Sequence, residues 1–351
     1  MRFHCNKFFL FIIIFISPIT YANERLIFAI DLIRHGDRTP LETLPKAPHE
    51  WRLGLGELTA EGMQQEFQLG SQCRQKYVTQ YHLLPPKYQP DTLYVRSTDY
   101  DRTLMSAESF LLGLYPPGTG PTLDNAQPAL PYDYQPIPIN TVPRKEDDLL
   151  VPDNNAEKYQ QLRSQYAETR PDWQAKTNAL KPKFAYWSEV TGQPITRLDD
   201  LGILADTLYI FQLKHIPLPP GLSDADIKQM MDAGTWSFIA TYQTPQIGSI
   251  TGHPLLMTIA KYLKKAAEHP SPLKYILFSA HDSTILSLMS AMHVPLAEEP
   301  HYASDVNFSL FEDEKGNVIV RIRYNGKPVI LPTCGKADCT LAEFLNDISI
   351  S

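Results

Sequence analysis

The sequence has few cysteines, no excess of positive charge and only one long hydrophobic run, and each shortage excludes a class of protein. Among the four cysteines and ten histidines of the 351 residues, no spacing matches a zinc or iron site. A formal net charge of −7 argues against nucleic acid as a partner, because binding to nucleic-acid phosphates needs a basic face. There is also no internal repeat and no low-complexity tract. These observations leave a globular protein whose 30 prolines lie in ordered loops.

The hydrophobic run lies at the beginning of the chain and predicts an export signal. Arg2 and Lys7 precede the apolar residues 8–16, and Ala22 lies in a cleavage site of small residues. The run is too short to span a bilayer, so residues 1–22 are interpreted as a signal peptide; an uncleaved anchor or a buried helix is the alternative. Cleavage leaves 329 residues with a net charge of −9, enough for roughly two domains or one domain with a large insertion.

Three cysteines remain after this cleavage, and two of them lie close together. In "CGKADC", Cys334 and Cys339 are near enough to close a small disulfide loop in an oxidising compartment. Cys73 is left over on a predicted helix, where we interpret it as a buried free thiol.

A strand, a polar turn and a helix follow one another three times. The first strand, "RLIFAIDLI" at 25–33, leads into "RHGDRTP", where Gly36 permits a sharp turn, and then into a helix capped by Thr59. The second strand, "TLYV", ends at Arg96, before "STD", which predicts a helix cap. The third strand, "YILFSA" at 275–280, is followed by "HDST" and another apolar helix.

Near-continuous apolar strands followed by helices indicate an α/β fold whose sheet is buried on both faces, and ligands bind such sheets at the carboxyl ends of the strands. Taken singly, an arginine at a strand end is usually a solvated charge, and a lone histidine is usually a satisfied surface or core group. Six such residues at three matching turns favour a functional site instead. The candidate site residues are Arg34, His35, Arg38, Arg96, His281 and Asp282.

The middle of the chain has a different character. Residues 131–244 are polar with a helical period, which predicts a helical cap inserted between two parts of an α/β core, 23–130 and 245–351. "QPIPINTVPRKEDDLL" is the expected connector, extended by its prolines, and its "RKEDD" is interpreted as a solvated turn. Further on, "DVNFSLFED" and "NVIVRIRY" predict a β-hairpin.

Three arginines and two histidines at one sheet edge indicate a site for a tetrahedral oxyanion. The planar guanidinium group binds phosphate or sulfate through paired, charge-assisted hydrogen bonds. His35 lies between Arg34 and Arg38, whose charges lower the pKa of its imidazole from about 6.5. The unprotonated ring can then attack a phosphoryl group, while the arginines and a protonated His281 stabilise the equatorial oxygens without a metal.

Asp282 is the candidate general acid that protonates the leaving alkoxide. Its ordinary pKa of about 3.9 is too low for this role. The neighbouring cations lower it further, but a bound phosphate dianion would raise it. We therefore expect substrate binding to protonate Asp282, which predicts an acidic pH optimum.

Three motifs, "RHGDRTP", "YVRSTDYDRTLMSA" and "SAHDST", resemble those of the histidine acid phosphatases, in the phosphoglycerate mutase-like superfamily, and especially the prostatic and lysosomal types. "WRLGLGELTAEGMQQEFQLG", "YPPG" and "LPTC" extend the resemblance over nearly the whole mature chain. It implies a mixed, mostly parallel sheet flanked by helices, a helical cap, no metal or other cofactor, and often a homodimer. It also implies these roles: His35 the nucleophile, Asp282 the proton donor, and Arg34, Arg38, Arg96 and His281 the phosphate ligands.

The sequence departs from the family pattern in three respects. "LGILAD" has Leu204 where prostatic-type members carry a tryptophan, which puts stacking of an aromatic leaving group in doubt. Animal members also carry more cysteines, so this fold must rely more on its core. After the "HD" pair, "STI" replaces the Thr-Asn common in phytases, and the net charge of −9 suits myo-inositol hexakisphosphate poorly. A phytase therefore ranks second.

The expected protein is a periplasmic or secreted acid phosphatase acting on small phosphomonoesters such as phosphotyrosine or nucleotides, with no nucleic-acid partner and no membrane partner after signal cleavage. Two other functions stay open. A non-catalytic phosphoester-binding protein would need the arginines but not His35 or Asp282. A mutase would keep a long-lived phosphohistidine and return the phosphate to a second site, whereas an acid beside a solvent-facing cleft favours water as the acceptor.

Overall fold

The central strand of the fold is β1 (Arg25–Arg34), which confirms the first predicted strand. The computed structural model describes residues 24–350, so the predicted signal peptide, residues 1–22, lies outside the described residues. The other strands are β2 (Leu93–Ser97), β3 (Tyr275–Ala280), β4 (Asp305–Glu312), β5 (Val318–Tyr324), β6 (Lys327–Pro328) and β7 (Asp338–Thr340). Their order in the sheet is β2-β3-β1-β4-β5-β6, and β7 pairs with β5.

The strand pairing brings the predicted turns to one edge of the sheet. β3 pairs in parallel with both β1 and β2, so the carboxyl ends of these three strands, at Arg34, Ser97 and Ala280, lie side by side. β4 and β5 form the predicted antiparallel hairpin. The sheet is mixed, as expected, but it is not mostly parallel, because β1 with β4 and β5 with β6 and β7 also pair antiparallel. Short turns join β4 to β5 and β5 to β6, and strands joined in this way pair antiparallel.

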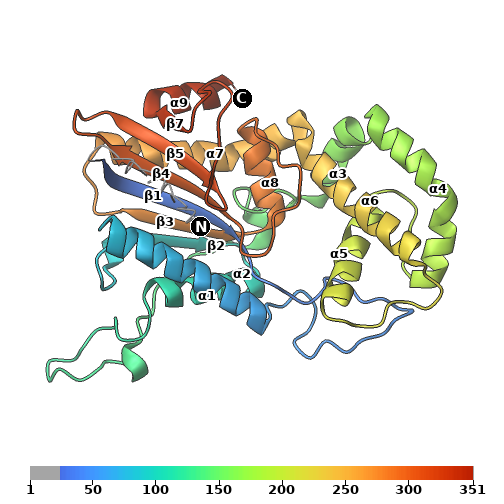
Figure 1. Ribbon diagram of the computed structural model, residues 1–351, viewed down its shortest axis with the longest axis horizontal. Helices are drawn as coiled ribbons and strands as arrows, with labels where there is room; N and C mark the ends of the chain where they lie inside the picture. The colour runs from blue at the N-terminus through green and yellow to red at the C-terminus, as the bar shows by residue number, and fades with distance from the viewer. Residues whose placement is uncertain (1–23, 351) are drawn as a thin grey trace, which may run out of the picture.

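Helices cover both faces of the sheet, as the continuous apolar strands predict (Figure 1). The α-helices of the described residues are α1 (Ala60–Arg74), α2 (Asp101–Leu114), α3 (Ala156–Leu162), α4 (Pro171–Thr191), α5 (Asp200–Leu213), α6 (Asp224–Gln243), α7 (Pro245–Glu268), α8 (Asp282–Ala291) and α9 (Leu341–Ile350). On one face, Phe110 of α2 and Tyr77 join Ile33 of β1 in a buried cluster. On the other face, Leu256 of α7 is buried in a cluster with Phe278 of β3.

Helices α3 to α6 gather beyond one end of the sheet, at the right of Figure 1. Their buried side chains, among them Trp187 and Phe211, form a separate apolar cluster. Leu44, in the loop after β1, and Ile247, at the start of α7, also belong to this cluster. The helical part is therefore packed onto the core through that loop. The division of the chain at residues 131 and 244 stays a prediction.

One of the two predicted helix caps is present. Thr59 caps α1, because its side chain accepts a hydrogen bond from the backbone amide three residues further on, at 3.2 Å. The cap predicted from residues 97–99 is wrong, since α2 begins after Tyr100 without a side-chain cap. Thr98 Oγ1 lies 3.0 Å from His281 Nε2 instead.

The cysteines behave as predicted. Cys334 and Cys339 form a disulfide, with 5.9 Å between their Cα atoms. Cys73 is free and buried on α1. Burial raises the pKa of its thiol well above the ordinary value, so it is a poor nucleophile.

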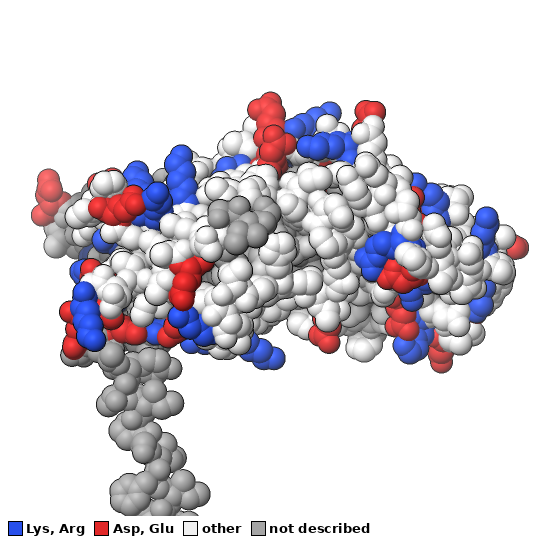
Figure 2. Space-filling model, turned by 90° about the horizontal axis from the view of Figure 1, so that it is seen from above, with Lys and Arg blue, Asp and Glu red and all other residues white. Residues whose placement is uncertain are grey.

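Charged side chains of both signs are interspersed on the face of the molecule seen in Figure 2. On this face, the lysine and arginine side chains do not form one continuous patch. Within residues 24–350, no helix combines the length and the apolar character needed to cross a membrane.

Glu66 on α1 is a buried carboxyl group without a partner. It is fully buried, and neither carboxyl oxygen has a hydrogen-bond partner among the described residues. Asp31 in β1 shows the contrast, since the Tyr77 and Tyr275 hydroxyls donate to it at 2.7 and 2.8 Å. Burial, followed by the charge of Asp305, raises the pKa of Glu66 well above its ordinary value.

We expect the stability of Glu66→Gln, compared with that of wild type, to be more favourable at pH 8 than at pH 4. A carboxyl group whose pKa is raised by folding contributes its full stability below the unfolded pKa of about 4.3 and loses that contribution as the pH rises through the folded pKa. The variant lacks this loss. Its free energy of unfolding relative to wild type should therefore increase by at least about 1.4 kcal/mol, the equivalent of one pKa unit, over this range.

Urea unfolding at the two pH values measures this difference. Glu61→Gln is the matched control, because Glu61 lies on the same helix, is exposed and has a lowered pKa. An equal gain in both variants at pH 8 would show that the buried charge is not the cause.

Candidate functional site

A cavity of about 1080 Å³ lies at the carboxyl edge of the parallel strands, and residues of α5 and α6 line it as well. Five of the six predicted site residues line this cavity. They come from the loop after β1 and from the junction of β3 with α8. They are Arg34, His35, Arg38, His281 and Asp282.

The loop after β1 is held in place by backbone contacts on both sides. The His35 amide donates to the Ala280 carbonyl at 3.0 Å, which ties the loop to the end of β3. A Cβ at Gly36 would lie 2.6 Å from Gly62 Cα, and a Cβ at Gly62 would lie 2.3 Å from the Asp37 carbonyl oxygen. Glycine is therefore needed at Gly36 for the close approach to α1.

The imidazole of His35 is buried, with 2% of the residue exposed. Its Nδ1 lies 2.8 Å from the carbonyl oxygen of Gly36. Because a carbonyl can only accept, Nδ1 carries the proton and Nε2 keeps its lone pair. The pKa of His35 lies well below 6.5. Burial is the largest cause, and the charges of Arg102, Arg34 and Arg38 lower the pKa further. The cations thus act in the direction that the sequence predicts, but desolvation contributes more.

Carboxylates hold two of the arginines in the cavity. Arg34 Nη2 lies 2.5 Å from Asp282 Oδ2 and 3.1 Å from Glu299 Oε1. Arg38 forms a bidentate pair with Asp206 of α5, at 2.9 and 3.1 Å. An anionic ligand at either guanidinium must therefore share it with a carboxylate or displace that carboxylate.

Arg96 is not among the residues that line the cavity, and the expectation that it lies at the phosphate site is wrong. Alternation along β2 places its side chain on the same face as Tyr94, where its Nη2 lies 2.5 Å from Asp147 Oδ1. Asp147 is fully buried and also accepts hydrogen bonds from the amides of Leu149 and Leu150. The "RKEDD" segment, expected to be a solvated turn, therefore supplies a buried partner for this arginine.

Arg102, in the first turn of α2, occupies the position expected of Arg96. It lines the cavity, and its guanidinium lies 4.5 Å from the centre of the Tyr100 ring. Arg102 forms no ion pair within residues 24–350. Burial, and then the charge of Arg38, lowers its pKa to about 10. An uncompensated cation in the first turn of a helix opposes the helix dipole. This conflict in "YDRTLMSA" is the sequence signal that could have identified Arg102.

His281 follows β3 directly and is joined to the start of α2 by hydroxyl groups. Its Nε2 lies 3.0 Å from Thr98 Oγ1, which lies 2.8 Å from Thr103 Oγ1. Because the Thr103 hydroxyl donates to backbone carbonyls, Thr98 donates to Thr103 and accepts from His281 Nε2–H. Burial, and then the charge of Arg102, lowers the pKa of His281 to about 3. The expected imidazolium is therefore disfavoured, and it would need an added negative charge nearby.

Asp282 begins α8 and faces the cations. Burial raises its pKa, but the charges of Arg34 and Arg38 outweigh burial, so the pKa of Asp282 lies below its ordinary value. The Ser283 amide also stabilises the carboxylate by donating to Oδ1 at 2.7 Å. This lowering of the pKa is the direction that the sequence predicts for the neighbouring cations alone.

Two further residues of the cavity, Glu299 and Tyr302, come from the segment before β4. Tyr302 lies against Arg34, with 4.6 Å from the guanidinium carbon to the ring centre, and 5.9 Å from the ring centre of His35. Burial raises the pKa of Glu299 to about 7, although the charge of Arg34 lowers it. Sequence reasoning missed both, because "EEPHY" is a loop without periodicity and only the fold places it.

The half of the cavity farther from His35 is lined largely by the helical part of the chain. Leu204 of α5 borders it but is only 4% exposed, because it packs in the same cluster as Phe211. Position 204 thus offers an aliphatic edge rather than an aromatic ring. Within residues 24–350, no group of three or more histidine, cysteine or acidic side chains is arranged to hold a metal ion.

Proteins of similar sequence include acid phosphatases. Lysosomal acid phosphatase of Homo sapiens is 35% identical over 343 residues, which cover 94% of this chain and 78% of that protein. Prostatic acid phosphatase of Homo sapiens is 32% identical over 352 residues, which cover 96% of this chain and 88% of that protein. The resemblance predicted from the motifs is confirmed.

Solved structures of phytases share the fold. The apo form of Hafnia alvei phytase has a TM-score of 0.66 and 17% identity, covering 93% of this chain and 97% of that one. Klebsiella sp. ASR1 phytase has a TM-score of 0.67 and 17% identity, covering 93% and 96%. At such identity the likeness concerns the fold alone, and it confirms the mixed sheet flanked by helices. The profile of the histidine phosphatase superfamily (branch 2) matches residues 25–325. The chain therefore belongs to branch 2 of the histidine phosphatase superfamily.

Proposed function

We propose that this chain is an exported acid phosphatase that hydrolyses small phosphomonoesters through a covalent phosphohistidine, without a metal. The observation that carries the proposal is His35: its Nδ1 proton is bound by the Gly36 carbonyl, its Nε2 keeps the lone pair, and its end of the cavity also contains the guanidinium groups of Arg34, Arg38 and Arg102. Relatives named acid phosphatases, at 32–35% identity over most of the chain, support the reaction class.

The proposed reaction has two steps. In the first, the Nε2 lone pair attacks phosphorus, the ester P–O bond breaks, and Asp282 gives its proton to the leaving oxygen. In the second, the Asp282 carboxylate takes a proton from water, the water oxygen attacks phosphorus, and the N–P bond breaks to release phosphate. The proton on Asp282 and the lone pair on Nε2 are then both restored.

The phosphate ligands in this proposal are Arg34, Arg38, Arg102 and His281. The negative charge of the transition state lies on the equatorial oxygens, where guanidinium groups can stabilise it by charge-assisted hydrogen bonds. Arg102 is the guanidinium without an ion pair among the described residues, so a dianion there restores local neutrality. The same dianion would raise the pKa values of Asp282 and His281, which favours a protonated Asp282 as the acid.

The remaining expectations belong to the same proposal. Residues 131–244 form a cap over the leaving-group half of the cavity, and residues 1–22 direct export to a periplasm or the medium. A homodimer stays a prediction. A phytase is the second candidate, favoured by the shared fold with Hafnia alvei and Klebsiella phytases. It is disfavoured by the carboxylates that line the cavity, because they repel a polyanion.

We expect His35→Ala to abolish turnover and Asp282→Asn to lower kcat/KM, which reports the first step alone, by about 10²–10⁴-fold for an alkyl phosphate. The Asp282→Asn loss should be much smaller for nitrophenyl phosphate, because nitrophenolate leaves without a proton. Phosphate release with EDTA present, for glycerol phosphate and nitrophenyl phosphate, measures both effects. Equal losses on the two substrates, or normal turnover by His35→Ala, would contradict the assigned roles.

We expect Arg102→Ala to impair activity and Arg96→Ala to impair stability. Arg102→Ala should lower kcat/KM by roughly 10²–10³-fold, as expected for loss of a charged donor to the transition state. Arg96→Ala should leave kcat/KM nearly unchanged but destabilise the fold by about 3 kcal/mol, because Asp147 is left buried without its cation. Urea unfolding and steady-state kinetics on both variants separate the two. A folded Arg96→Ala enzyme without activity would return Arg96 to the site.

We expect Glu299→Gln to extend activity to higher pH. Glu299 pairs with Arg34. Burial and the charges of Asp282 and Asp206 raise its pKa to about 7, although the charges of Arg34 and Arg38 lower it. Glu299 is therefore neutral in acid and charged above pH 7. The charged form competes with phosphate for Arg34. The variant should match wild type at pH 5 and exceed it in kcat/KM at pH 8.

The pH profile of kcat/KM checks this competition. Glu298→Gln is the control, since the neighbouring Glu298 also borders the cavity but is exposed and forms no ion pair within residues 24–350. An unchanged alkaline limb in Glu299→Gln would rule out Glu299 as the competing group.

A further inference from the structure

The far half of the cavity has an aromatic wall built from α3 and α6. Tyr159 of α3 stacks on Tyr242 of α6, with 6.1 Å between ring centres, and Phe238 meets Tyr242 edge to face at 5.4 Å. All three rings line the cavity. Because each ring is packed against another, the wall is a rigid apolar surface on the leaving-group side.

The rings of this wall differ from those at the phosphate end in their contact with cations. At the phosphate end, Arg34 lies over Tyr302, and Arg102 and Arg144 lie over Tyr100 at 4.5 and 4.0 Å. No arginine or lysine of the described chain is placed over Phe238 or Tyr242. Phe238 is partly exposed, so the negative face of its ring is available to a cation from a ligand, whereas Tyr242 is buried behind it.

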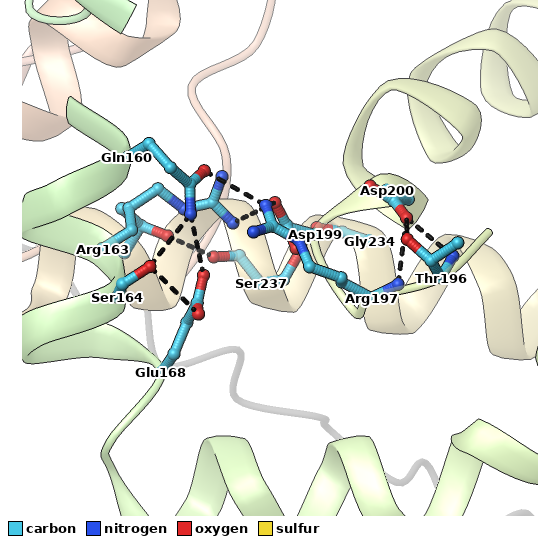
Figure 3. A network of polar contacts seen from close by, with 11 residues as sticks. Gln160, Arg163, Ser164, Glu168, Thr196, Arg197, Asp199, Asp200, Gly234 and Ser237 are labelled. Carbon is cyan, nitrogen blue, oxygen red and sulfur yellow. Dashed lines mark hydrogen bonds and ion pairs between the residues drawn. The ribbon is translucent and has the colours of Figure 1, made fainter. Parts of the chain in front are cut away.

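Within residues 24–350, Arg163 is the one cation that lies over a ring of this wall, and a carboxylate already pairs with it. Its guanidinium lies 5.9 Å from the Tyr159 ring centre and pairs with Asp199 at 2.9 Å. Figure 3 shows that Asp199 also accepts from Arg197, which reaches Gln160 as well. Glu168 and Asp200 also act on Arg197, so three carboxylates balance the two guanidinium groups. This cluster does not leave a positive charge that would repel a cationic ligand.

Asp153 is the unneutralised charge beside the wall. It lines the cavity, is accessible to solvent there, and forms no ion pair within residues 24–350. Asp153 lines the same cavity as Tyr159 and Tyr242, and its charge contributes to raising the pKa of both hydroxyl groups. Surrounding protein atoms desolvate Asp153, and this desolvation, together with the charge of Asp282, raises its pKa. A cation beside it would stabilise the carboxylate.

We propose, on the basis of the phosphatase function above, that the cavity selects phosphomonoesters of short alcohols that carry a positive charge. The ammonium or quaternary ammonium group would lie against Phe238, which Tyr242 supports from behind, and beside Asp153, while the phosphate lies at His35. A neutral aromatic alcohol could stack on the same rings but would leave the carboxylate unpaired. A polyphosphorylated alcohol would place anions against it.

The test compares phosphocholine with 3,3-dimethylbutyl phosphate, in which carbon replaces the nitrogen, so that shape is kept and charge removed. We expect wild-type kcat/KM to favour phosphocholine by about tenfold, equivalent to about 1.4 kcal/mol. Asp153→Asn should bring the ratio of the two kcat/KM values close to one. Phe238→Leu should also lower the ratio. Asp232→Asn, an exposed position on α6 that pairs with Lys228, should leave the ratio as in wild type.

The outcomes separate this inference from the proposed function. Turnover of nitrophenyl phosphate and of both esters without preference for phosphocholine would overturn the inference and leave the phosphatase intact. If no ester is hydrolysed, the proposed function fails, and the inference is decided by calorimetric titration of His35→Ala with the same two esters. Tighter binding of phosphocholine, lost in Asp153→Asn with His35→Ala, supports it; equal binding overturns it.

Discussion

The imidazole of His35 is buried beside three guanidinium groups, and the surrounding structure maintains this concentration of positive charge. Burial alone disfavours the imidazolium, and the arginines add to this effect, so the proposed nucleophile is neutral even in acid. The Gly36 carbonyl binds the Nδ1 proton and thereby leaves the lone pair on Nε2. The close approach of Gly36 to Gly62 holds the loop where this contact forms.

So much positive charge must be balanced, and the balancing groups come from several parts of the fold. Asp282 and Glu299 hold Arg34, and Asp206 of α5 holds Arg38. The last pair joins the helical part of the chain to the loop after β1, so the geometry of the phosphate end depends on how the helices are docked. Arg102 has no such partner among the described residues, and this asymmetry leaves its charge for an incoming anion to neutralise.

The two halves of the cavity are therefore electrostatically different. Guanidinium groups dominate near His35, whereas aromatic rings and the unpaired carboxylate of Asp153 line the far side. A monoester has the same division, with a dianion at one end and an alcohol at the other. Charge complementarity at both ends would favour a monoester with a charged alcohol over one with a neutral alcohol, rather than raise the affinity for all monoesters alike.

The sequence by itself determined the buried strands, the hairpin, the cap at Thr59 and the cluster of His35, Arg34, Arg38, His281 and Asp282, because apolar runs and turn residues act locally. Only the tertiary structure decided which arginine near β2 enters the cavity. Arg96 pairs with Asp147, 51 residues further along the chain, and this buried partner could not be inferred from local pattern. Glu299, Tyr302 and Asp153 lie in loops without periodicity, so their place in the cavity depends on how distant segments pack together.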